Sequence, residues 1–187
     1  MSIKNYNKII IPAKFNTIID NKTIEISKEY SKWVLSIKDE RINYLKKYLK
    51  SYNISLNCTE KSLKELFIWF SNNIEFREQT KEELKKYEKF RDVIVNTKTF
   101  SAETVSLIFD IALFWGECLI SRKKNIDWSI NSVEKGDVNY AFPLIADDED
   151  GGLNSRQLIE VVAYKIMDKT PLKDEFNNLL DIWIDMV

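Results

Sequence analysis

The chain contains no histidine. Because the imidazole side chain is the usual general base near neutral pH, this absence excludes Ser-His-Asp and Cys-His catalytic systems and most zinc sites. Glycine is also scarce, with four residues in 187, and the sequence has neither a GxGxxG motif nor a Walker phosphate loop. Any catalysis would have to depend on carboxylates, lysines or tyrosines. Because the usual catalytic and phosphate-binding motifs are absent, we expect no catalytic residue, no cofactor and no metal site.

Cysteine is nearly absent. The two cysteines, Cys58 and Cys118, lie in unlike sequence contexts and form no CxxC pair, and the first residues lack the apolar run of a signal peptide. We therefore expect both thiols to be reduced in a cytoplasmic protein.

No charge of one sign predominates, since 28 Lys and Arg residues oppose 29 Asp and Glu residues. A formal net charge of -1 provides no broad basic field, so nucleic-acid binding is not expected. The basic residues of segment 38–50 have the spacing of the solvent face of an amphipathic helix. The longest apolar stretch, 105–120, is shorter than the ~20 residues that a membrane span needs and contains Asp110 and Glu117. We interpret it as a core helix and expect no membrane partner.

The composition favours a single globular domain over residues 1–187, because 44% of the residues are hydrophobic, 30% are charged and few are Gly or Pro. Residues 1–26 carry β-branched runs and a turn, which predict a strand and a hairpin. The body, 27–187, has mainly helical periodicity. Helix starts are indicated by Thr59 or Ser62, by Thr80 with Glu83 three residues later, by Ser101, and by Pro171 behind Thr170.

The period drops to two in one part of the body. Ile126, Trp128 and Ile130 alternate with polar neighbours, and a second alternating run follows at 138–144, with Gly136 and Asp137 between the two runs. This pattern predicts a hairpin. The sequence as a whole predicts a mainly helical α+β fold with a central buried helix and a small antiparallel sheet.

Three acids of the central helix, Glu103, Asp110 and Glu117, are seven residues apart and therefore lie in one stripe. We interpret Asp110 and Glu117 as structural residues that pair with Arg41, Arg122 or a Trp indole N–H, because buried acids in folded proteins are normally satisfied by partners. The alternative is a metal site or acid–base catalysis. Seven-residue spacing separates two acids by ~10 Å, too far for them to hold one ion without a third element.

The densest charge cluster is the run Asp147, Asp148, Glu149 and Asp150, which we call the acidic segment. It fails the EF-hand calcium pattern, because Ala146 and Gln157 occupy the two end positions. The segment is either a solvated turn or a patch that docks on a basic protein surface. Trp69 lies beside the apolar stripe of its helix and is the tryptophan we expect to be a partly exposed interface anchor.

Several short stretches occur together in this chain: Trp33-Val34-Leu35-Ser36-Ile37 with Arg41, Thr59 to Leu63 with Trp69, Glu103 to Leu107 with Asp110, Trp115-Gly116-Glu117 followed by Trp128, and Leu153-Asn154. In this combination the chain resembles a family of small uncharacterised bacterial proteins, over most of its length beyond residue 30. The resemblance implies an immunity or accessory protein of the kind encoded near bacterial toxins.

The resulting functional hypothesis is a non-enzymatic protein-binding module, an immunity protein that binds and neutralises a toxin. One alternative is an enzyme or small-ligand binder that uses Asp110 and Glu117. Another is a subunit of a bacterial defence or stress assembly.

Overall fold

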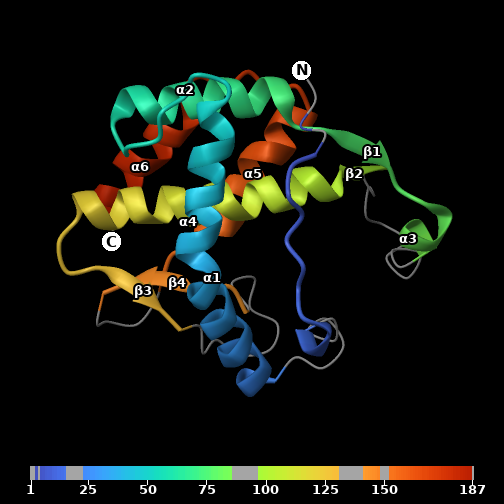
Figure 1. The fold of residues 1–187 in the computed structure, drawn as a ribbon, viewed down its shortest axis with the longest axis horizontal. Coiled ribbons are helices and arrows are strands. Elements are labelled where there is room, and N and C mark those ends of the chain that lie inside the picture. Colours follow the sequence, from blue (N-terminus) through green and yellow to red (C-terminus); the bar gives the residue numbers. More distant parts are fainter. Residues whose placement is uncertain are drawn as a thin grey trace.

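Figure 1 shows the fold in a computed structural model, which describes residues 3, 5–15, 23–85, 97–130, 141–147 and 152–186. The fold is mainly helical α+β, as predicted. The helices are α1 (Ile24–Lys50), α2 (Glu60–Asn73), α3 (Lys81–Lys85), α4 (Ala102–Arg122), α5 (Ser155–Met167) and α6 (Glu175–Met186), with a short 3-10 turn at Ala13–Phe15. The strands are β1 (Phe76–Glu78), β2 (Lys98–Phe100), β3 (Asp127–Ser129) and β4 (Leu144–Ala146).

Helix α4 lies at the centre of the fold. It contacts α1, α5 and α6, and α1 crosses it steeply (Figure 1). Every residue from Leu107 to Gly116 is buried, which confirms the predicted central helix. By length and composition α4 could cross a membrane, but 78% of its most apolar window is buried inside the fold, as in the core helix of a soluble protein.

Local capping signals set the starts of three helices as the sequence predicts. The hydroxyl of Thr59 accepts the Ser62 N–H at the start of α2. The hydroxyl of Ser101 accepts the Thr104 N–H at the start of α4 in the same way. At α3 the hydroxyl of Thr80 accepts the N–H of the third helical residue, Glu83, whose carboxylate accepts the Thr80 N–H in return, so a complete capping box is present.

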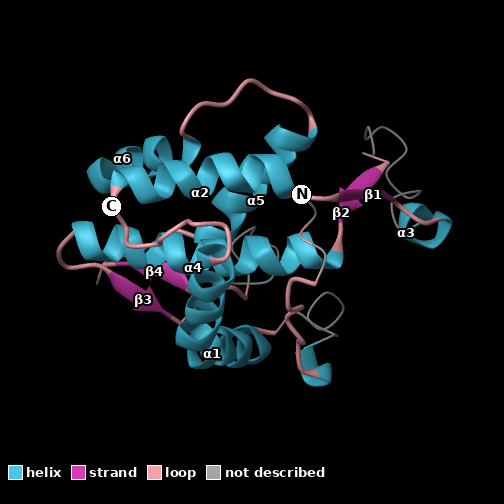
Figure 2. Cartoon of the chain, turned by 45° about the horizontal axis from the view of Figure 1, so that its top comes forward, coloured by secondary structure: helices cyan, strands magenta, loops and turns pink. Residues whose placement is uncertain are grey.

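Two small antiparallel sheets lie at opposite ends of α4 (Figure 2). Strands β1 and β2 form one sheet, and β3 and β4 form the other, in which Trp128 is opposite Ile145. The predicted pairing of the 126–130 run with a later strand is confirmed, but the partner strand is Leu144–Ala146, and the described residues 141–143 of the predicted run are not part of it. Residues 131–140 lie outside the described part of the chain.

The predicted strand and hairpin over 1–26 are wrong in the residues that are described. Residues 5–12 form an irregular segment whose Ile9 N–H donates to the Ser106 hydroxyl on α4, so a side chain takes the place of a strand partner. Thr23, assigned to the hairpin, is the N-cap of α1, because its hydroxyl accepts the Ile26 N–H. Residues 16–22 lie outside the described ranges.

The last helix also starts later than predicted. Pro171 is not its first residue, because α6 begins at Glu175. Asp174 has a positive φ of 56°, which interrupts helical backbone, and its carbonyl accepts the N–H groups of Asn177 and Asn178. The first turn of α6 is therefore organised around Asp174.

The two cysteines form a disulfide, so the expectation of two reduced thiols is wrong for this structure. The α1–α2 loop, residues 51–59, folds back onto α4 and brings the Cα atoms of Cys58 and Cys118 to 5.0 Å. Leu56 of this loop is buried, and Arg122 donates to the Cys58 carbonyl at 2.7 Å. Residues that are 60 positions apart in the sequence thus become covalent neighbours.

Candidate functional site: polar clusters along the central helix

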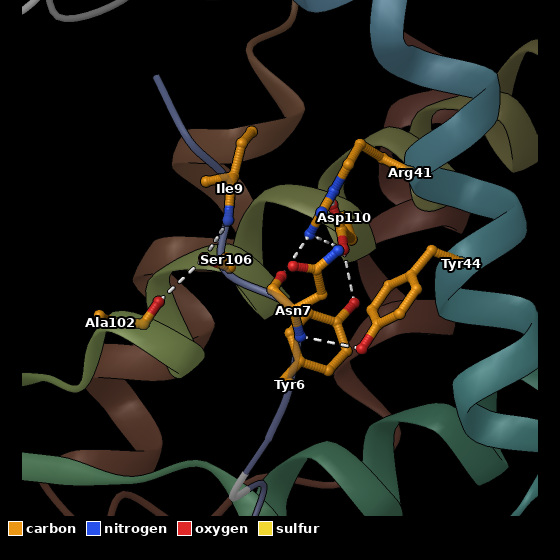
Figure 3. Close-up of polar contacts among 8 residues, drawn as sticks. All are labelled: Tyr6, Asn7, Ile9, Arg41, Tyr44, Ala102, Ser106 and Asp110. Atoms are coloured by element: carbon orange, nitrogen blue, oxygen red, sulfur yellow. Dashed lines mark hydrogen bonds and ion pairs between the residues drawn. The ribbon is translucent and has the colours of Figure 1, made fainter. Parts of the chain in front are cut away.

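The fully buried carboxylate of Asp110 is held by two elements outside its own helix (Figure 3). Arg41 of α1 forms two parallel hydrogen bonds with it, from Nε to Oδ1 at 2.8 Å and from Nη2 to Oδ2 at 2.7 Å. The Tyr6 hydroxyl donates to Oδ2 at 2.5 Å. Both carboxylate oxygens therefore have donors, and the geometry is the strong bidentate form of an Arg–carboxylate pair.

This polar cluster also fixes the N-terminal segment. Arg41 Nη2 donates to the Asn7 carbonyl at 3.0 Å, and the Asn7 N–H donates to the Tyr44 hydroxyl at 2.8 Å (Figure 3). Tyr6 is buried, and its ring packs edge-on against the rings of Tyr44 and Tyr48. The segment is thus held to α1 and α4 by side chains rather than by strand pairing.

Burial controls the protonation of this cluster. It raises the pKa of Asp110 to about 6, against the lowering effect of Arg41 and Tyr6. Burial and the charge of Asp110 raise the pKa of Tyr6 well above its usual range. Burial lowers the pKa of Arg41, but the contacts with Asp110 outweigh it and the net shift is upward. At neutral pH Arg41 and Asp110 form a buried ion pair, and the pKa of Asp110, about 6, lies only about one pH unit below neutrality.

Glu117 lies one heptad further along α4 and is partly exposed. Its Oε1 accepts the Trp128 indole N–H at 2.7 Å and also contacts the ammonium group of Lys38. Of the predicted partners, a tryptophan indole is confirmed. Lys38 was not predicted, and Arg41 is used by Asp110 instead.

The adjacent Trp115 and Gly116 explain how Trp128 reaches Glu117. A Cβ atom at Gly116 would overlap the Trp128 ring and lie 2.9 Å from Ile145 Cδ1, so glycine allows the β3–β4 hairpin to pack directly on α4. The indole of Trp115 points elsewhere in the fold and donates to the Phe176 carbonyl of α6 at 2.9 Å. This Trp-Gly-Glu triplet therefore joins α4 to two later elements.

The third acid of the stripe, Glu103, pairs with Lys8 at 2.9 Å near the protein surface. The Lys8 contact and the Glu103 backbone N–H hold the pKa of Glu103 below its usual value. Each acid of the stripe thus has separate partners. Across the described ranges, no group of three or more His, Cys, Asp or Glu side chains could hold a metal ion.

Arg122, predicted as a partner of the helix acids, has a different contact. Its guanidinium donates to the carbonyl of Cys58 at 2.7 Å. It therefore anchors the α1–α2 loop beside the disulfide instead of neutralising a carboxylate, and the prediction of an acid partner is wrong for this contact.

The acidic segment begins where β4 ends. Asp147 is exposed, whereas Asp148, Glu149 and Asp150 lie outside the described residues. The register of the sheet places Asp127 opposite Ala146, so this exposed acid of β3 lies beside the start of the segment. Sequence reasoning missed Asp127 because the strand register was not known.

Trp69 is buried, with 7% of its surface exposed, so the expectation of a partly exposed tryptophan is wrong. Tyr48 of α1 and Tyr52 of the α1–α2 loop pack their rings against it. Its indole N–H has no hydrogen-bond partner within the described part of the chain. The adjacent Ile68, rather than Trp69, is exposed on this helix, at 50%.

Two hollows open along α1. The first, the cysteine hollow, has a volume of about 380 Å³. It is lined by Asp39, Ile42, Asn43, Lys46, Cys58, Phe114, Glu117 and Ser121. The second, the lysine hollow, has a volume of about 630 Å³. It is lined by Lys46, Lys47, Lys50 and residues 53–56.

No family model, no curated protein and no solved structure matches this chain.

Proposed function

We propose that this chain is a non-enzymatic protein-binding module, a cytoplasmic bacterial immunity protein that binds and neutralises a toxin. The observation that carries the proposal is the placement of exposed acids at the β3–β4 sheet. Asp127 lies beside the start of the acidic segment, so the sheet gathers carboxylates that the sequence separates by twenty residues. Such a patch favours a partner with a basic surface, because opposite potentials speed and orient association.

The state of the buried acids supports binding over catalysis. Asp110 is an acid whose pKa is raised by burial, but it is fully buried and both of its oxygens accept hydrogen bonds from Arg41 and Tyr6. A general base must reach the proton that it removes, and this carboxylate has no free face for a substrate. Glu117 is closer to solvent, but it accepts from both Lys38 and Trp128.

The near-neutral total charge supports a local mechanism of recognition. With a formal net charge of -1 the whole chain exerts little long-range attraction, so any electrostatic steering has to come from a patch. The acidic segment is the densest patch of one sign in the sequence. A toxin neutralised through this surface should present lysines or arginines at its own binding or active site.

The first test is growth rescue. Proteins encoded next to this chain's gene are expressed in a bacterial host, with and without the chain. The proposal predicts that one of them arrests growth and that co-expression of this chain restores it. Toxicity that persists in the presence of the folded chain, for every neighbouring protein, would contradict the proposal.

The second test measures association with the toxin that the chain neutralises in the first test. The four acids of the acidic segment are changed to Asn or Gln. The control makes the same change at four exposed acids that lie on helices, Glu40, Glu82, Asp181 and Asp185. The first variant should associate more slowly at low salt, and the difference should shrink as salt screens charges beyond ~8–10 Å. Equal slowing in both variants would show a net-charge effect and remove the acidic segment from the interface.

A further inference from the structure

The two sulfurs of the disulfide differ in accessibility. Cys118 is fully buried in α4, whereas Cys58 is only partly buried and lines the cysteine hollow. A reagent that enters this hollow therefore meets Cys58 first. Accessibility is one of the factors that decide which sulfur of a disulfide a thiolate attacks.

Cations lie on the side of the cysteine hollow that adjoins the lysine hollow. Lys46 lines both the cysteine hollow and the lysine hollow, so the two hollows are adjacent. The lysine hollow adds Lys47 and Lys50, and no carboxylate is among its described lining residues. Arg122 adds a fourth cation, because its guanidinium binds the Cys58 carbonyl.

Two carboxylates line the cysteine hollow and share one cation. Asp39 and Glu117 both contact the ammonium group of Lys38, which offsets part of their charge. The adjacent lysine hollow has three lysines and no carboxylate among its described lining residues. Negative charge on an incoming molecule is therefore favoured on the side where the two hollows meet at Lys46.

We propose that Cys58 is a thiol-exchange site selective for small acidic thiols, whose carboxylates are attracted by Lys46, Lys47 and Lys50. The incoming thiolate attacks Cys58 Sγ and forms a mixed disulfide, the Cys58–Cys118 bond breaks, and its electron pair leaves on Cys118 Sγ, which takes up a proton. A second thiolate attacks the small-molecule sulfur of the mixed disulfide and releases Cys58. Two thiols are oxidised to one small disulfide, and the protein disulfide is reduced to two thiols.

The exchange would change the attachment of the α1–α2 loop. The disulfide is its covalent link to α4, and its other described contacts include the buried Leu56, the hydrogen bond from Arg122 to the Cys58 carbonyl and the packing of the Tyr52 ring on Trp69. Modification at Cys58 breaks the covalent link and leaves the loop to these noncovalent contacts. The proposal uses no residue of the acidic segment, so it does not depend on the proposed function.

The first experiment compares the two sulfurs as free thiols. The variants Cys118→Ser and Cys58→Ser each retain one cysteine, and both are checked for folding by circular dichroism. With dithiobis(nitrobenzoate), a dianionic disulfide reagent, Cys58 should react at least about tenfold faster than Cys118, because thiol reactivity follows exposure. Equal rates in folded variants would overturn the assignment of Cys58.

The second experiment tests charge selectivity in the Cys118→Ser background. Lys46, Lys47 and Lys50 are changed to Gln, and the control changes Lys28, Lys32 and Lys64, which are exposed lysines elsewhere. The first triple variant should react roughly fivefold more slowly with the dianionic reagent at low salt, because it lacks three positive charges that attract the reagent. With neutral dithiodipyridine, which the lysines do not attract, the slowing should be clearly smaller.

The third experiment uses the chain with both cysteines and glutathione, a thiol with two carboxylates. Intact mass and peptide mapping after acid quenching should place the mixed disulfide on Cys58, and reduction by glutathione should slow in the Lys46, Lys47 and Lys50 variant. Reduction by neutral mercaptoethanol should be unchanged. An adduct on Cys118, or the same lysine dependence for both thiols, would refute the proposal.

Discussion

Replacement of Arg41 by Gln is the perturbation that most directly tests the buried cluster. The change removes both hydrogen bonds to Asp110 and the bond to the Asn7 carbonyl. It leaves a fully buried carboxylate whose described remaining donor is the Tyr6 hydroxyl. Loss of one member of a buried ion pair costs about 3–5 kcal/mol, because the other charge is left without compensation.

The pKa of Asp110 determines how this cost depends on pH. Burial raises the folded-state pKa to about 6, above the ordinary value of 3.8, so the folded chain holds this proton more tightly than the unfolded chain does. The contribution of the group to stability is therefore fully present below pH 3.8 and is lost as pH rises through 6. A difference of two pKa units corresponds to about 3 kcal/mol. Without Arg41 the folded pKa rises further, so the loss extends to higher pH.

Urea unfolding followed by tryptophan fluorescence at pH 5 and pH 8 measures the effect. We expect Arg41→Gln to lower the free energy of unfolding by about 3–5 kcal/mol at pH 8 and by about 1–2 kcal/mol at pH 5, where protonated Asp110 carries no charge. The control Lys8→Gln breaks the surface pair with Glu103 and should cost less than about 1 kcal/mol. Adding Asp110→Asn to Arg41→Gln should recover stability at pH 8. A cost that is equal at both pH values, or no recovery in the double variant, would refute the role assigned to the buried charge.

Two further predictions concern α4. Glu117→Gln should lower the free energy of unfolding by about 1–2 kcal/mol, because it weakens the charged contacts with Lys38 and Trp128, and toxin binding should be retained. A variant that melts like the parent but no longer protects against the toxin would favour the enzyme or ligand-binding alternative. Removal of the Cys58–Cys118 disulfide should cost about 4 kcal/mol, because the cross-link closes a loop of 60 residues in the unfolded chain. Urea unfolding with and without reductant measures the second effect, and a difference below about 1 kcal/mol would contradict it.

The elements that were predictable from the sequence are those set by local interactions. Thr59 and Ser101 cap their helices within three residues, and the apolar residues all around α4 require burial on every side. The prediction for the run Ile9 to Ile11 was wrong because it, too, rested on local propensity alone. Its β-branched residues favour a strand, but the Ile9 N–H bonds to a side chain on α4 and Ile10 is 86% exposed, so a tertiary contact overrides local propensity.

The site was predictable only in part, because its partners come from distant segments. A buried Asp110 requires a cation, which made Arg41 a reasonable candidate, but no sequence pattern distinguishes it from Arg122. The Tyr6 hydroxyl carried no local signal, since its contact depends on the path of the irregular N-terminal segment. Trp69 was misjudged because a tyrosine of α1 and another from the loop after it cover the ring.

The disulfide bears directly on where and how the proposed immunity function should be tested. Disulfides persist in oxidising compartments and are rare in the cytosol, whereas the cytoplasmic location remains a prediction. In a reducing cytosol Cys58 and Cys118 would be thiols, and the α1–α2 loop would be held only by noncovalent contacts, such as those of Leu56, Arg122 and Tyr52. The acidic segment follows β4, and the β3–β4 sheet, which packs on α4 at Gly116, contains neither cysteine. Toxin binding through the acidic segment should therefore have the same rate in the oxidised and the reduced chain, and a strong dependence on reductant would move the interface to the surface around Cys58.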